Sequence, residues 1–157
     1  MKTKVWSDAE ERIVNRLMLL KHPKREEIIK RVVDLHKHAL EDEPYDFPLN
    51  YESIDVLIIL INKLGECKLP SLVITPHKNL QVQWGRKYDD RKLVAELYPN
   101  KFISYIITQR KHKKCIRVSV ISSIEEFFTV IKDEAIMRWL YDGKPMDGLG
   151  ETRKQYF

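Results

Sequence analysis

Over the first 66 residues the apolar side chains recur every three or four positions, which is the period of a helix. This pattern predicts three helices, at Ser7–Lys21, Arg25–Leu40 and Tyr51–Glu66. Ser7 is placed to cap the first helix, because its hydroxyl can accept a bond from a free backbone N–H group. The third segment is apolar nearly all round, so we expect it to lie centrally between other elements. Its β-branched residues leave a strand at Asp55–Ile61 as the alternative.

From Pro70 onward the apolar period changes to two, the period of a strand with one buried face. The alternation predicts strands at residues 72–74, 80–84, 92–97, 102–108 and 116–121. Short connections favour an antiparallel meander, because parallel crossovers need a dozen or more residues. Trp84 continues the apolar face of its own strand, so we expect it in the core rather than stacked on a ligand. A last helix is predicted to begin after Ser122 or Ser123.

These elements predict an α+β fold. N-terminal helices and a central helix would pack on a four- or five-stranded antiparallel meander, and a C-terminal helix would follow it. The 157 residues suffice for one domain that buries about two-thirds of its unfolded surface. We expect a single domain over residues 1–157, made of a helical N-terminal region (1–49), an α+β core (50–141) and a tail (142–157).

The positive charge is concentrated in the predicted sheet. The net charge is +5, yet residues 70–121 alone carry 11 Lys or Arg against 3 Asp or Glu, and the segments on either side are slightly acidic. Such a local excess attracts polyanions, including acidic proteins. We therefore looked for the binding surface among the connections of the sheet.

Two connections hold most of this charge. In a sequential meander they lie at the same end of the sheet, and we call their cationic residues the basic rim: Arg86, Lys87, Arg91, Lys92, Arg110, Lys111, Lys113 and Lys114. The rim suits phosphates or carboxylates, through point charges and forked guanidinium bonds. The structural alternative is a solubilising hairpin whose lysines discourage pairing between sheet edges.

A second candidate surface is the exposed face of the same sheet. Gln81, Gln83 and Arg117 are expected there, and Tyr105 is the aromatic side chain expected beside them. An exposed tyrosine on such a face would stack on a nucleic-acid base.

Catalytic and metal-binding motifs are missing from the sequence, which has no G-x-S-x-G, H-E-x-x-H or phosphate-loop pattern. His36 and His38 would point to different sides of one helix, so they cannot share a metal ion. Cys67 and Cys115 are too few for a disulfide scaffold or a four-cysteine site. We therefore expect no catalytic residue, no metal and no cofactor.

One acidic stretch leaves an enzyme as an alternative. Its carboxylates are Glu41, Asp42, Glu43 and Asp46, in a segment whose prolines and turn formers predict a solvated loop. A small enzyme of unknown reaction would use this loop with His36 or His77 for acid–base work.

Nothing in the sequence indicates a membrane or secreted protein. The longest apolar run, Val56–Ile61, is far short of the roughly 20 residues that span a bilayer. The N-terminal segment lacks an apolar stretch followed by a small-residue cleavage site. We expect a cytoplasmic protein without a membrane partner.

The middle of the chain carries Thr75-Pro76, followed by Leu80, Val82 and Trp84 on one strand face, after an apolar helix. In this it resembles a loose group of small bacterial proteins with a helix, a Thr-Pro strand, a strand that ends in Trp and a meander. The resemblance covers about residues 50–130 and departs at 77–79, where that group usually has an Asp-Gly-Gly turn. The resemblance implies an α+β fold and a bacterial cytoplasmic protein, similar to those encoded by accessory genes of mobile elements. It implies no activity.

The sequence thus favours a non-enzymatic bacterial binding or accessory protein that acts through a protein partner. The alternative is a nucleic-acid-binding protein that uses the basic rim. A homodimer is a further open alternative, through the edge strand at Leu72–Ile74 or the apolar segment at residues 139–141.

Overall fold

The structure is a computed structural model that describes residues 7–42, 48–85, 91–111, 114–133 and 140. Three helices come first and a sheet follows them. The elements are α1 (Asp8–Leu17), α2 (Arg25–Asp42), α3 (Tyr51–Leu64), β1 (Ser71–Ile74), β2 (Leu80–Trp84), β3 (Arg91–Leu97), β4 (Phe102–Lys111), β5 (Lys114–Ser123) and α4 (Ile124–Asp133). The predicted α+β class is confirmed, and residues 55–61 are helical rather than extended.

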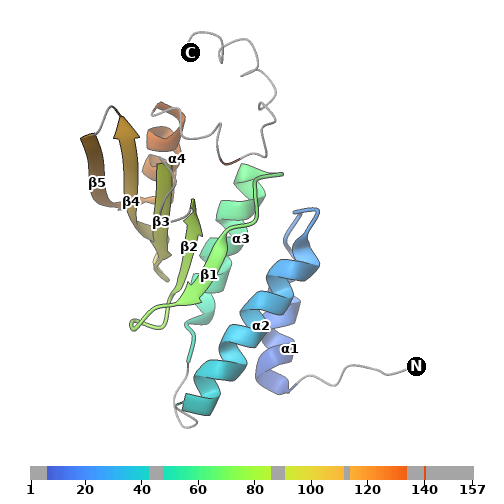
Figure 1. The fold of residues 1–157 in the computed structure, drawn as a ribbon. Coiled ribbons are helices and arrows are strands. Elements are labelled where there is room, and N and C mark those ends of the chain that lie inside the picture. Colours follow the sequence, from blue (N-terminus) through green and yellow to red (C-terminus); the bar gives the residue numbers. More distant parts are fainter. Residues whose placement is uncertain (1–6, 43–47, 86–90, 112–113, 134–139, 141–157) are drawn as a thin grey trace.

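The five strands form one antiparallel sheet in the order β1-β2-β3-β4-β5, so the predicted meander is also confirmed. Each strand pairs with the next along the chain (Figure 1). The register aligns Leu72, Val82, Ala95, Tyr105 and Val120 in one row across all five strands. The connections β2–β3 and β4–β5 therefore open at the same end of the sheet.

The helix ends follow partly from local sequence and partly from tertiary contacts. Ser7 Oγ accepts from Glu10 N–H at 3.2 Å, and Ser123 Oγ accepts from Glu126 N–H at 3.2 Å, as the capping rule predicts. The predicted extent of the first helix to Lys21 is wrong, because α1 ends at Leu17. Asn62 of α3 explains the early end: its side chain donates to Leu19 O at 3.1 Å and accepts from Lys21 N–H at 2.8 Å.

α3 is the central helix, as its apolar character predicted. It contacts α1 on one side and β2 and β3 on the other. Its buried residues are Ser53, Ile54, Val56, Leu57, Ile58, Leu60, Ile61 and Leu64. α4 packs on β4 and β5, and Phe127 of α4 meets the ring of Tyr105 edge-on at 5.0 Å between centroids.

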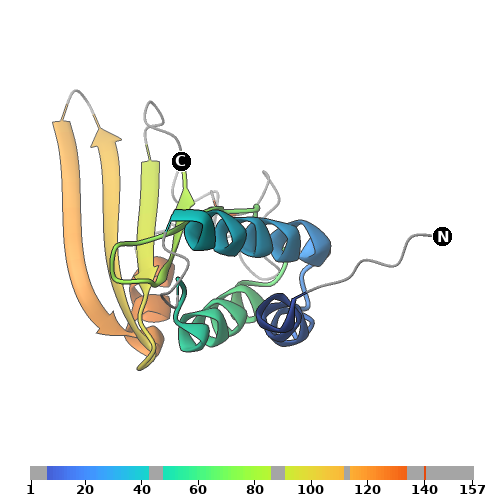
Figure 2. The same cartoon turned by 90° about the horizontal axis from the view of Figure 1, so that it is seen from below.

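The helices leave one part of the sheet open. Figure 2 shows α1, α2 and α3 grouped beside the β1 side of the sheet, away from β5.

Trp84 lies in the core as predicted, with 2% of its surface exposed and its Nε1–H bonded to Lys68 O at 2.8 Å.

Candidate binding face of the sheet

The side chains of each strand alternate between the two faces of the sheet. Those of the inner face pack on α3 and α4, and include Leu80, Val82, Leu93, Ala95 and Ile103. The opposite side chains form what we call the outer face: Val73, Gln81, Gln83, Lys92, Val94, Glu96, Phe102, Ser104, Ile106, Thr108, Arg110, Cys115, Arg117, Ser119 and Ile121. Gln81, Gln83 and Arg117 alternate toward this face; the two glutamines are half-buried and Arg117 is exposed.

The outer face has a cationic end. Lys92 of β3, Thr108 of β4 and Arg117 of β5 stand in one cross-strand row. Arg110 follows Thr108 on the same face of β4 and is opposite Cys115. We call Lys92, Arg110 and Arg117 the cationic end. It lies at the end of the sheet where the β2–β3 and β4–β5 connections open.

The predicted basic rim is described only in part. Arg86, Lys87 and Lys113 lie outside the described residues, and for Lys111 and Lys114 only the backbone pairing at the end of the β4–β5 ladder is described. Arg91 is half-buried, pairs with Gln109 and alternates toward the inner face. The meander therefore brings the two rim connections to one end, while the described charge on the outer face comes from Lys92, Arg110 and Arg117.

Next to the cationic end the outer face becomes apolar. Val94 and Ile106 stand side by side in the next row, between Gln83 and Ser119. Ile121 is 73% exposed and Phe102 is 43% exposed on the same face. The sequence analysis missed these four residues, although Arg117, Ser119 and Ile121 at every second position already signalled one exposed strand face.

Tyr105 does not belong to this face, and its predicted exposure is wrong. Its side chain is completely buried against Phe127 on the inner face. β4 carries apolar residues on both faces, Ile103 and Ile107 inward and Phe102 and Ile106 outward, so its alternation did not identify the buried side. Among the described residues the aromatic side chain of the outer face is therefore Phe102, at the end opposite the cations.

Glu96 is the acidic residue of the outer face, and its carboxylate is engaged in holding a turn. Its Oε2 accepts from Thr75 Oγ1 at 2.8 Å and from Asn79 Nδ2 at 3.1 Å, and lies 3.2 Å from His77 Nδ1. Burial alone would raise the pKa of Glu96, but these hydrogen bonds outweigh it and lower the pKa. The bonds fix the β1–β2 turn, in which Lys78 has a φ of 65°.

The two histidines considered for acid–base work lie in unrelated surroundings. His36 is buried in α2, with 2% of its surface exposed, whereas the His77 side chain is 70% exposed beside Glu96. Neither bonds Glu41 or Asp42 in the described structure, and Glu43 and Asp46 lie outside it. His38 is exposed, with Nδ1 2.7 Å from Asp34 O, so it points away from His36 as predicted. Within the described ranges no three His, Cys, Asp or Glu side chains gather closely enough to hold a metal ion.

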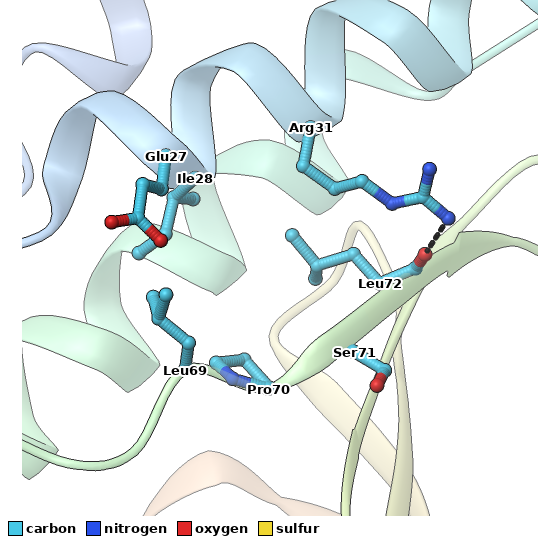
Figure 3. A pocket seen from close by; sticks show the side chains of 7 residues that line it. All are labelled: Glu27, Ile28, Arg31, Leu69, Pro70, Ser71 and Leu72. Carbon is cyan, nitrogen blue, oxygen red and sulfur yellow. Dashed lines mark hydrogen bonds between the residues drawn. The ribbon is translucent and has the colours of Figure 1, made fainter.

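A pocket of about 270 Å³ lies between α2 and β1 (Figure 3). Its walls are Glu27, Ile28, Arg31, Leu69, Pro70, Ser71 and Leu72. Arg31 reaches across it and donates from Nη2 to Leu72 O at 3.1 Å, while Glu27 lies on the other side. This contact takes up one backbone carbonyl of β1, the edge strand that the sequence analysis had offered as a dimer surface.

Comparison with known proteins adds no assignment. The chain matches no protein-family model, no curated protein and no solved structure with which it was compared. In the described part of the chain no helix has both the length and the apolar character needed to cross a membrane. The function is therefore argued from the face itself.

Proposed function

We propose that this protein is a non-enzymatic binding protein that engages an acidic protein partner on the outer face of its sheet. One observation carries the proposal: the cationic end lies next to an apolar patch, Val94 and Ile106, on the outer face. In the described structure no helix covers this face. Val94 and Ile106 lie one row from Lys92 and Arg117. Protein interfaces combine an apolar centre with charged groups at the rim in this way.

The positive charge of the outer face favours an acidic partner. The cationic end holds Lys92, Arg110 and Arg117, and the carboxylate of Glu96 is already bonded within the β1–β2 turn. Complementary fields raise association rates and suppress binding of like-charged partners. An acidic segment with apolar side chains would satisfy both halves of the face.

The same face is less suited to nucleic acid. Binding of single strands relies on aromatic side chains next to the cations, where bases stack. Tyr105, the aromatic predicted for that role, is buried, and Phe102 lies at the other end of β4. A protein partner therefore fits the described chemistry better.

The test is a fluorescence-anisotropy titration with labelled probes at several salt concentrations. The probes are a poly-glutamate peptide, the same peptide with leucine at intervals, a duplex DNA and a single-stranded RNA. We expect the leucine-containing acidic peptide to bind most tightly. The double variant Lys92→Glu/Arg110→Glu should weaken it roughly tenfold at low salt.

A matched variant controls for net charge. Arg12 and Lys30 are exposed on α1 and α2, and Arg12→Glu/Lys30→Glu changes the charge by the same amount away from the outer face. This control should leave peptide binding unchanged. Equal binding by the wild type and the Lys92→Glu/Arg110→Glu variant would overturn the proposal. Tighter binding of DNA or RNA, abolished by that variant, would replace it with the nucleic-acid function.

A further inference from the structure

The two edges of the sheet differ in how well they are shielded. β1 is only four residues long, between Pro70 and Pro76, and the carbonyl of Leu72 is bonded to Arg31. A short strand, flanking prolines and a covering element are the devices by which proteins protect a sheet edge. The β1 edge is thus closed to another strand.

β5 lies at the other edge and has none of these devices. It is ten residues long and contains no proline or glycine, and no described strand pairs with its free side. Val118 is 43% exposed and Ile121 is 73% exposed. A long edge strand of this kind presents a row of unpaired backbone groups that accept another strand.

The sequence of β5 indicates that a second copy of the same strand can pair with its free edge. If a second copy of β5 runs antiparallel with Ser119 opposite itself, Val118 faces Val120 on the inner face and Arg117 faces Ile121 on the outer face. Nine residues, 115–123, then overlap. The aliphatic stem of each Arg117 would cover the exposed Ile121 of the other copy.

Charge supports the same register. In the pairing centred on Ser119 the two Arg117 residues lie four positions apart along the ladder, or about 14 Å at the usual rise of a strand. At that distance their repulsion is largely screened by salt. A centre at Arg117 would place the two guanidinium groups face to face, and a centre at Val118 would make them diagonal neighbours.

We propose that the chain forms a two-fold symmetric dimer by antiparallel pairing of β5 with β5 of a second copy, centred on Ser119. Such an interface is isologous, because the same residues act on both sides. The two-fold axis is perpendicular to the sheet. Both outer faces therefore lie on the same side of one ten-stranded sheet. The dimer does not depend on the acidic partner, since it forms through the backbone edge of β5; of the cationic end only Arg117 lies on that strand.

The first test is the mass in solution, measured by sedimentation equilibrium over a wide range of protein concentration. The wild type should approach twice 18.7 kDa. Ile121→Lys and Val118→Lys place a charge on the edge and should each raise the dissociation constant at least about tenfold. Both residues are solvent-exposed, and circular dichroism checks that the fold is kept. Val73→Lys, at a similarly exposed position on β1, is the matched control and should leave the mass unchanged.

The second test determines whether the two β5 strands pair with Ser119 opposite Ser119. Directly opposed residues have Cα atoms about 4.5–5.5 Å apart, within the range that a disulfide spans. Ser119→Cys in a Cys115→Ser background should therefore give a covalent dimer on mild oxidation. Ser104→Cys in that background, one strand inside the edge, should dimerise without forming the covalent link. A wild type of 18.7 kDa at every concentration, a dimer unaffected by Ile121→Lys, or a Ser119→Cys variant that does not cross-link would overturn the proposal.

Discussion

Ser53 on the central helix donates its hydroxyl proton to the carbonyl of Leu97 at the end of β3, over 2.6 Å. The same oxygen accepts from the N–H of Leu80 at 2.8 Å, so one side chain joins α3 to two strands. Ser53 is completely buried. The two backbone groups that it satisfies lie in buried hydrogen bonds.

Ser53→Ala should accordingly cost about 2–4 kcal/mol of unfolding free energy, because two buried backbone groups lose their partner. Urea denaturation followed by circular dichroism measures the cost. Ser104→Ala, the same change on the outer face, is the control and should shift stability by less than about 0.5 kcal/mol. A Ser53→Ala variant as stable as this control would contradict the role given to the hydroxyl.

Glu96→Gln should lower stability at neutral pH by roughly 1 kcal/mol, because the charged acceptor of the β1–β2 turn is lost. The hydrogen bonds of folded Glu96 lower its pKa below the ordinary 4.5. Its contribution is therefore complete above pH 4.5 and is lost as the pH falls through the folded pKa. Denaturation curves of the two proteins should converge in acid. Glu66→Gln, at an exposed glutamate, supplies the control; a constant gap at every pH would refute the assignment.

Acidification should also destabilise the protein through His36. Burial lowers the pKa of His36 below the ordinary 6.5, and the nearby carboxylate of Glu10 offsets only part of this effect. The unfolded chain takes up a proton near pH 6.5 and the folded chain only at lower pH, so stability falls as the pH drops below 6.5.

The variant His36→Leu removes this dependence and also a buried Nδ1 that has no hydrogen-bond partner in the described structure. We expect its melting temperature to exceed that of the wild type below pH 6.5, by a margin that shrinks above it. His38→Gln, at an exposed histidine of the same helix, should follow the wild type. An equal acid response in His36→Leu and the wild type would show that other groups control it.

The ion pair between Arg16 and Asp55 should contribute little, although its Nη1 and Oδ2 atoms are only 2.6 Å apart. The two side chains are 39% and 48% exposed, and exposed pairs contribute about 0.2–1 kcal/mol. A double-mutant cycle with alanine at both positions measures the coupling. Arg16→Ala alone should cost more than Asp55→Ala, because the guanidinium also lies over the ring of Tyr51 at 5.6 Å. A coupling of several kcal/mol would contradict this expectation.

Periodicity was sufficient to predict where helices and strands form, but not which side of β4 is buried. Trp84 was placed correctly because glutamines separate the apolar residues of β2. Tyr105 was misplaced because both faces of β4 are apolar, and only the packing of α4 decides between them. The early end of α1 depends on Asn62, and the closed edge of β1 depends on Arg31, two contacts between residues far apart in the chain. That the two basic connections lie at one end of the sheet could be predicted, since that inference needed only the strand order.

The bond from Arg31 to the carbonyl of Leu72 sets a limit on assembly. A sheet with two open edges resembles a bifunctional monomer, which can add units at either end and grow into a fibre. With β1 occupied, this chain is monofunctional, and a pair joined through β5 carries a blocked edge at both outer ends. Growth would then stop at two copies, and the short β1 with its bond to Arg31 is the feature that makes the assembly finite.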